Sequence, residues 1–80
     1  MMEILIVDDT LENIRLASEA LSDYSTSFAR SGEEDLTLLK QEQYDLILLD
    51  VMMPGIDGYE TCKQLRKLPQ HVNTPVIFLT

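Results

Sequence analysis

The sequence predicts an α/β fold in which a parallel sheet carries helices on both faces. Three nearly continuous apolar runs of four residues are bounded by polar or turn residues, which is typical of strands buried on both sides. Segments with helical spacing separate these runs, and this alternation favours a parallel sheet with crossover helices. Because the chain has only 80 residues and no internal repeat, we expect one domain at most, spanning residues 1–80.

Four strands are expected, at residues 4–7, 25–29, 46–49 and 76–79. The second, Ser25-Thr26-Ser27-Phe28-Ala29, has too few large apolar residues for the middle of a sheet, so we predict an edge strand. Pro75 is expected to open the last strand at its first residue, where a missing backbone N–H does least harm.

Three helices are expected between the strands, because apolar residues recur there at steps of three or four. The stripes are Leu11, Ile14, Ala17 and Leu21, then Leu36, Leu39 and Gln43, then Cys62, Leu65 and Leu68. Ser31 and Asp57 are placed to cap the second and third helices, since a Glu follows each at the third position. Pro69 is expected to end the third helix. Surface roles are expected for an acidic first turn of the second helix and for a solvated basic face of the third: Glu33, Glu34, Asp35, Lys63, Arg66 and Lys67.

Composition narrows the range of partners. The chain has 14 acidic and 6 basic side chains, a net charge of −8, which argues against binding nucleic acid or an anionic membrane. No apolar run approaches the length of a membrane span. The lone Cys62 excludes a disulfide framework and a cysteine-based zinc site, and it suits a cytoplasmic location.

Polar side chains follow the expected strands where each strand ends. Asp8 and Asp9 follow the first strand, Asp50 follows the third and Thr80 follows the fourth. Ligands of open α/β sheets bind at this edge. Carboxylates about 5 Å apart repel by roughly 3 kcal/mol per pair at an effective dielectric near 20, and a hard cation such as Mg2+ relieves that repulsion. A carboxylate beside such a metal is also a nucleophile toward phosphorus, with an aspartyl phosphate as product.

Three segments resemble the receiver domains of two-component response regulators: residues 4–9, 48–58 and 75–80. The resemblance implies a flavodoxin-like, doubly wound sheet of strand order 2-1-3-4. It implies that Asp50 accepts a phosphoryl group from a histidine kinase or phosphotransfer protein, and that Asp8, Asp9, Asp50 and the backbone carbonyl of Met52 hold Mg2+. Thr80 would be the switch hydroxyl, and the domain would signal by a conformational change rather than as an enzyme.

The resemblance covers strand one through strand four. A receiver normally continues through a fourth helix, a fifth strand bearing a phosphate-pairing lysine, and a fifth helix, so we expect a receiver domain that is incomplete at its C-terminus. The absence of these elements from the sequence would leave the fourth strand uncovered. A homodimer through that strand, or exchange of elements with a second copy, is therefore an expected partner interaction.

Other interpretations stay open. Asp8 and Asp9 are suitable caps for the first helix, and the side chains of Met52 and Met53 suit ordinary loop packing. His71 lies in the loop from Pro69 to Pro75, on no helical face with a nearby base, so a phosphotransfer role is disfavoured. The competing functions are a non-catalytic, self-associating or partner-binding module and a metal-dependent phosphatase. The sequence names neither the kinase nor the output.

Overall fold

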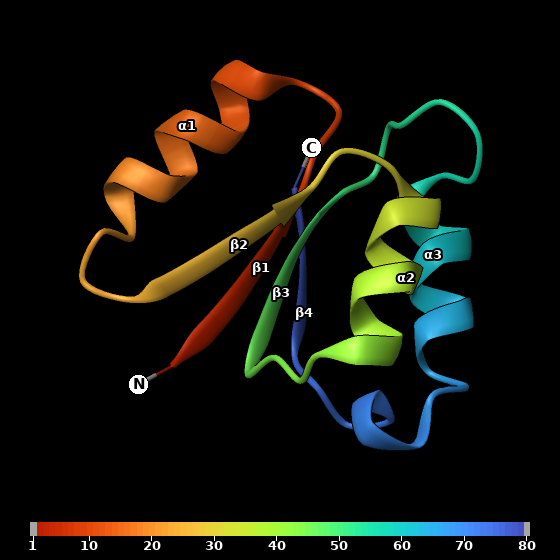
Figure 1. Ribbon diagram of the computed structural model, residues 1–80. Helices are drawn as coiled ribbons and strands as arrows, with labels where there is room; N and C mark the ends of the chain where they lie inside the picture. Colours follow the sequence, from red (N-terminus) through yellow and green to blue (C-terminus); the bar gives the residue numbers. More distant parts are fainter. Residues whose placement is uncertain (1, 80) are drawn as a thin grey trace.

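The computed structural model describes residues 2–79, which form a four-stranded parallel sheet in the order β2-β1-β3-β4 (Figure 1). This order and the α/β class confirm the predicted fold. The elements in chain order are β1 (Glu3–Val7), α1 (Leu11–Ala20), β2 (Ser25–Ala29), α2 (Gly32–Gln41), β3 (Leu46–Asp50), α3 (Gly58–Leu65), a short 3-10 helix (Pro69–His71) and β4 (Val76–Leu79). Among the described residues, no helix is both long and apolar enough to cross a membrane.

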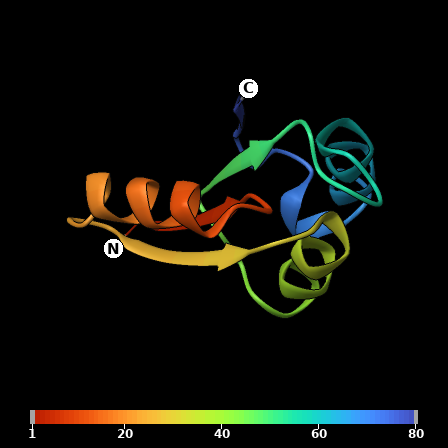
Figure 2. The ribbon, with the colours of Figure 1, turned by 90° about the horizontal axis from the view of Figure 1, so that it is seen from above.

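Helices lie on both faces of the sheet. Seen from above, α1 lies on one side and α2 and α3 lie together on the other (Figure 2). On the α1 side, Ile14 packs with Ile4 and Ile6 of β1. On the opposite side, Leu39 and Leu65 join side chains of β1 and β3 in the larger core cluster. β1 therefore buries apolar side chains on both of its faces, as its nearly continuous apolar run predicts.

The predicted caps form on two of the three helices. The Ser31 hydroxyl accepts a hydrogen bond from the Glu34 amide at 3.0 Å, and the Asp57 carboxylate accepts one from the Glu60 amide at 2.9 Å. Each bond satisfies a backbone donor that a helix N-terminus leaves without a partner. The two caps thus determine where α2 and α3 begin, and both helices begin beside the carboxyl edge of the sheet.

Helix ends depart from the sequence prediction. α2 ends at Gln41, so Gln43 is not part of the helical stripe, and α3 ends at Leu65, before Leu68 and four residues before Pro69. The cause at α3 is Arg66, whose guanidinium donates to the carbonyls of residues 71, 72 and 74, at 2.5 Å for the last. Arg66 thereby folds the following segment back on the helix instead of lying on a solvated face.

The loop before β4 contains His71, which is fully buried. Its Nδ1 lies 3.0 Å from the Thr74 hydroxyl and its Nε2 lies 3.3 Å from the Glu42 carbonyl. These contacts make His71 an interior support of the loop. Pro75 directly precedes β4 rather than opening it, and its carbonyl accepts a hydrogen bond from the amide of Ile47.

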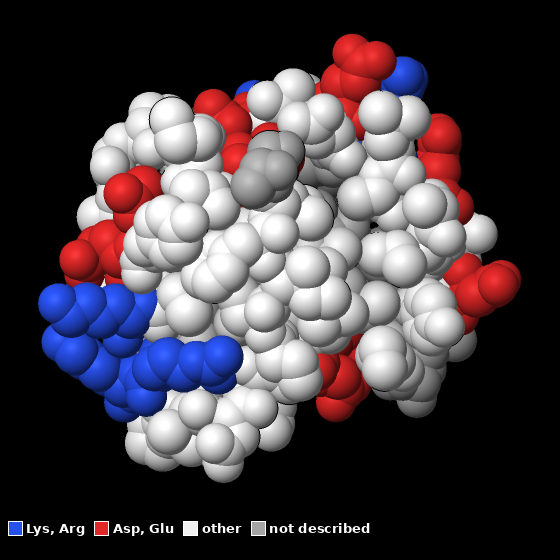
Figure 3. Space-filling model, turned by 180° about the vertical axis from the view of Figure 1, so that it is seen from behind, with Lys and Arg blue, Asp and Glu red and all other residues white. Residues whose placement is uncertain are grey.

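Both edge strands carry exposed apolar side chains. β2 is an edge strand, as predicted, and Phe28 on it is exposed. On the opposite edge strand, β4, Ile77 is 50% exposed and Phe78 is 39% exposed. The prediction that this apolar run is buried on both faces is therefore wrong, because among the described residues β4 lies at the edge of the sheet. Viewed from behind, the centre of the surface is mostly uncharged, with a group of Lys and Arg side chains at one side of it (Figure 3).

Candidate functional site

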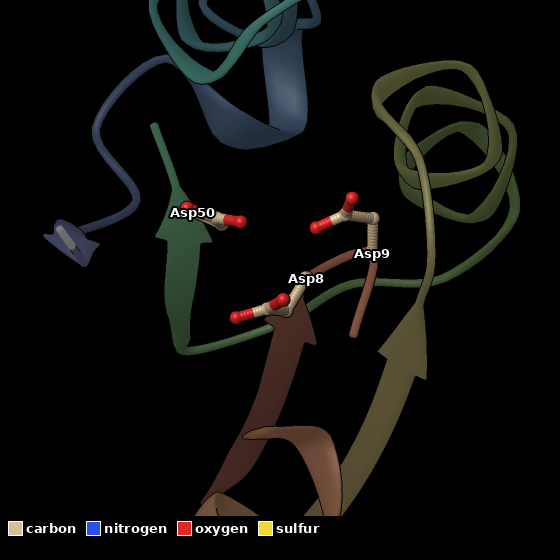
Figure 4. Close-up of side chains that lie close together, drawn as sticks. All are labelled: Asp8, Asp9 and Asp50. Atoms are coloured by element: carbon tan, nitrogen blue, oxygen red, sulfur yellow. The ribbon is translucent and has the colours of Figure 1, made fainter. Parts of the chain in front are cut away.

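Three aspartates meet at the carboxyl edge of the two central strands. Asp8 and Asp9 directly follow β1, and Asp50 is the last residue of β3. The register pairs Val7 with Leu49, so the next residues of the two strands, Asp8 and Asp50, are neighbours. One carboxylate oxygen from each of the three residues lies within 4.8 Å of the others, and the side chains converge on a common space (Figure 4). The parallel topology thus gathers residues 42 positions apart in the sequence.

Local hydrogen bonds orient Asp8. Its side chain is buried, and its two carboxylate oxygens accept hydrogen bonds from the Thr10 amide at 2.9 Å and from the Asn13 side-chain amide at 3.3 Å. The N-cap residue of α1 is Thr10, whose own side chain makes no capping bond. Neither Asp8 nor Asp9 is the N-cap residue of α1, so the capping interpretation of these aspartates is wrong. Asp8 instead supports the turn into α1 through the Thr10 amide and contributes to the acidic cluster.

Asp50 is partly buried, and its Oδ1 accepts a hydrogen bond from the Met52 amide at 3.1 Å. The pKa of Asp50 lies above its ordinary value, first because burial disfavours the charged form, and also because Asp8 and Asp9 repel a third negative charge; the Met52 amide acts in the opposite direction. A cation at this position would favour the ionised form of all three groups. The electrostatics of the cluster therefore suit a bound cation.

The donor chemistry fits Mg2+. Magnesium prefers hard oxygen ligands, keeps several waters and usually binds proteins through one or two carboxylates. Asp8, Asp9 and Asp50 supply such oxygens within 4.8 Å of one another. Met52 is placed beside Asp50 through its amide, while its side chain is 78% exposed rather than packed in the loop. The predicted role of the Met52 carbonyl stays a prediction, and Thr80 lies outside the described residues.

α3 begins against the end of β3, with Gly58 buried at the contact. The Gly58 amide donates to the Val51 carbonyl at 3.0 Å. A Cβ at residue 58 would lie 2.8 Å from Cα of Val51 and closer still to the Asp50 carbonyl oxygen, both of which are backbone atoms. Glycine at this position therefore allows the helix to start directly beside the backbone that carries Asp50.

We expect Gly58→Ala to lower the free energy of unfolding by about 1–3 kcal/mol, because the added methyl forces α3 and the end of β3 apart. Urea unfolding followed by circular dichroism measures the change. Lys63→Ala, an exposed substitution on the same helix, is the control and should change stability by less than about 0.5 kcal/mol. A Gly58→Ala protein as stable as the control would show that the two backbones separate without strain.

Two acidic residues of α2 have tertiary contacts or burial that the sequence did not predict. Asp35, expected on an exposed first turn, is fully buried, and within residues 2–79 neither of its carboxylate oxygens has a hydrogen-bond partner. One signal was present, because Asp35 precedes the core residue Leu39 by four positions and so shares its helical face. Glu33 contacts the amide of Ile56 at 3.4 Å. No local sequence pattern predicts a contact between residues 23 positions apart.

Comparisons with known proteins agree with this geometry. The model of the response regulator receiver domain family matches residues 4–80. A probable cyclic di-GMP phosphodiesterase of Vibrio cholerae is 46% identical over 78 residues, which make up 96% of this chain and 18% of that protein. This chain therefore spans less than a fifth of the length of that relative.

Two solved structures have closely similar folds. The chemotaxis response regulator CheY4 of Vibrio cholerae matches with a TM-score of 0.94 and 32% identity, over 98% of this chain and 67% of that one. The response regulator TrrA of Thermotoga maritima, solved in complex with Mg2+ and BeF, matches with a TM-score of 0.84 and 35% identity, over 98% of this chain and 66% of that one. From the family match, the strand order and the acidic cluster together, the chain belongs to the response regulator receiver domain family.

Proposed function

We propose that this receiver domain is a phosphoacceptor in which Asp50 takes a phosphoryl group with the help of Mg2+. Receiver domains are signalling modules that interact with histidine kinases or phosphotransfer proteins. The observation that carries the proposal is the convergence of Asp8, Asp9 and Asp50, whose carboxylate oxygens lie within 4.8 Å of one another at the edge where α/β folds bind ligands. A cytoplasmic location, where such a kinase would present its phosphohistidine, belongs to the same proposal.

The chemistry follows from the roles of the three carboxylates. Bound Mg2+ would neutralise charge on the transferring group and on Asp50. One oxygen of Asp50 attacks phosphorus, so that an O–P bond forms while the bond from phosphorus to the donor nitrogen breaks, and the leaving imidazole takes a proton from solvent. Asp8 and Asp9 would hold the metal together with Asp50 and the Met52 carbonyl. Thr80 is proposed as the hydroxyl that responds to the new phosphoryl group.

Intact-mass spectrometry of the chain after incubation with Mg2+ and acetyl phosphate tests this proposal. We expect a gain of one phosphoryl group that disappears when EDTA removes the metal. Circular dichroism on both samples confirms that the chain is folded. A folded chain that gains no mass in the presence of Mg2+ would contradict the proposal.

A second candidate function, self-association through β4, is supported by the exposure of Ile77 and Phe78 on an edge strand. Within residues 2–79, β4 pairs only with β3. Sedimentation velocity on the samples used for mass spectrometry separates the two candidates. A dimer that forms without Mg2+ or phosphodonor, in a chain that is never labelled, supports the interaction module over the phosphoacceptor.

A further inference from the structure

The segment between β3 and α3, residues 51–57, borders the acidic cluster and contains Met52. Near its start, the amide of Met52 donates to Asp50. In the part of the chain that the structure describes, residues 53–56 have one hydrogen bond to another element, from the Ile56 amide to Oε1 of Glu33 at 3.4 Å. The segment is thus held at two points: Met53, 8% exposed, packs in the core cluster, and the Ile56 amide is bound by a side chain of α2.

Glu33 lies directly over the turn in this segment. Gly55 has a φ of 78°, a left-handed conformation that favours glycine. A Cβ at Gly55 would lie 2.8 Å from Oε1 of Glu33 and 3.3 Å from Oε2, so the carboxylate contacts one side of the turn while it accepts the hydrogen bond of the next residue, Ile56. Two separate contacts thus place the same carboxylate against the segment.

The backbone next to Glu33, in the first turn of α2, is closely packed. The adjacent Gly32 is buried, and a Cβ there would lie 2.5 Å from Cγ1 of Ile56 and closer to the hydroxyl of Thr61 on α3. Ser31 caps the helix immediately before these residues. The first turn of α2 packs closely against Ile56 and α3, so this end of the helix is not frayed. The backbone from which the Glu33 side chain extends therefore has a defined position.

We infer that Glu33 is a positioning residue of the phosphoacceptor site, whose carboxylate holds residues 51–57 in the conformation that places Met52 beside Asp50. The inference rests on the proposed function, in which the Met52 carbonyl is a metal ligand. Loss of the carboxylate would free the turn at Gly55 and let Met52 move away from the position it needs to bind Mg2+. A preorganised ligand binds more tightly because less order is imposed on binding.

Calorimetric Mg2+ titrations at constant ionic strength test this inference on four variants of the full chain. Glu33→Ala should weaken Mg2+ binding about three- to tenfold, the effect of losing one hydrogen bond. Glu33→Gln keeps a carbonyl oxygen that accepts the Ile56 amide and should stay within about twofold of wild type. Glu34→Ala and Glu34→Gln, exposed on the same turn, are the matched controls and should have equal affinities close to that of wild type.

The variants separate positioning from charge. If Glu33→Gln weakens Mg2+ binding as much as Glu33→Ala does, the charge of Glu33 matters and the positioning role is wrong. If Glu33→Ala matches Glu34→Ala, Glu33 has no role at the site. Hydrogen exchange of the Ile56 amide in the metal-free chain gives an independent readout, and we expect faster exchange in Glu33→Ala alone.

That exchange measurement also separates this inference from the proposed function. A wild-type chain that binds no Mg2+ would contradict the proposed function, whereas the exchange of the Ile56 amide would still decide whether Glu33 holds the segment. Unchanged exchange in Glu33→Ala would overturn the inference. Circular dichroism on each variant confirms that helix content is retained.

Discussion

Asp50→Asn is expected to abolish phosphoryl incorporation while leaving the chain folded. The asparagine amide has no anionic oxygen with which to form an acyl phosphate. We therefore expect no residual phosphorylation at this position. Its carbonyl oxygen is still able to accept the hydrogen bond that the Met52 amide donates to Oδ1 of Asp50 at 3.1 Å. Removal of one of the three negative charges also reduces the electrostatic repulsion within the acidic cluster of the folded chain. Intact-mass spectrometry after treatment with Mg2+ and acetyl phosphate measures the loss.

Asp23→Asn is the matched control, because it makes the same change from carboxylate to amide as Asp50→Asn. Asp23 is exposed and lies outside the acidic cluster. This variant should gain one phosphoryl group as the wild type does. Peptide mapping of the labelled wild type should place the modification on Asp50. Retention of the label by Asp50→Asn would mean that another carboxylate is the acceptor and that the proposed site is wrong.

The second large effect is on stability and comes from Asp35. Its side chain is 0% exposed and its carboxylate oxygens have no partner among the described residues. Burial raises the pKa of Asp35 from 3.8 to about 7. Burial raises the pKa of the neighbouring Tyr44 phenol, and the negative charge of Asp35 acts in the same direction. The carboxyl group is therefore neutral in the folded chain at mildly acidic pH.

The pH dependence follows from the two pKa values of Asp35. Below pH 3.8 the group is protonated in both states, and its contribution to stability is fully present. As pH rises toward 7 the unfolded chain releases the proton while the folded chain keeps it, so stability falls until the folded form also ionises above pH 7. About three pH units at 1.36 kcal/mol each give a loss of about 4 kcal/mol from this group.

Asp35→Ala should remove this dependence and raise the free energy of unfolding at pH 7.5 by about 2–4 kcal/mol, less the effect of the small cavity left behind. Urea unfolding at several pH values between 4 and 8 measures both effects. The raised pKa of Asp50 acts in the same direction, so the difference between Asp35→Ala and wild type, rather than the wild-type curve alone, isolates Asp35.

Glu34→Ala is the control for the Asp35 experiment, because Glu34 is exposed on the same turn of α2 and should change stability by less than about 0.5 kcal/mol. A wild-type chain and an Asp35→Ala chain with parallel stability curves would show that Asp35 finds a partner or solvent in the folded state. A less stable Asp35→Ala chain would show that the carboxyl group contributes packing that outweighs its desolvation.

Much of the fold was predictable because its signals are local. The apolar runs at residues 4–7, 46–49 and 76–79 became β1, β3 and β4, and the sparse apolar content of residues 25–29 correctly indicated an edge strand. Helix starts were predictable where a cap lies within three residues of its donor, as at Ser31 and Asp57. The predicted end of α3 was wrong because Arg66 binds carbonyls up to eight residues away.

The sequence alone determined that Asp8, Asp9 and Asp50 lie at the carboxyl ends of two apolar strands, which parallel strands place at one edge of a sheet. That β1 and β3 are neighbours, so that the three carboxylates meet, was decided by the strand order. Only the tertiary structure decided the burial of Asp35, the contact of Glu33 with Ile56 and the interior position of His71. The physical reason is distance along the chain. Caps and strand runs depend on neighbours within a few residues, whereas burial and long-range hydrogen bonds depend on how helices pack against the sheet and against each other.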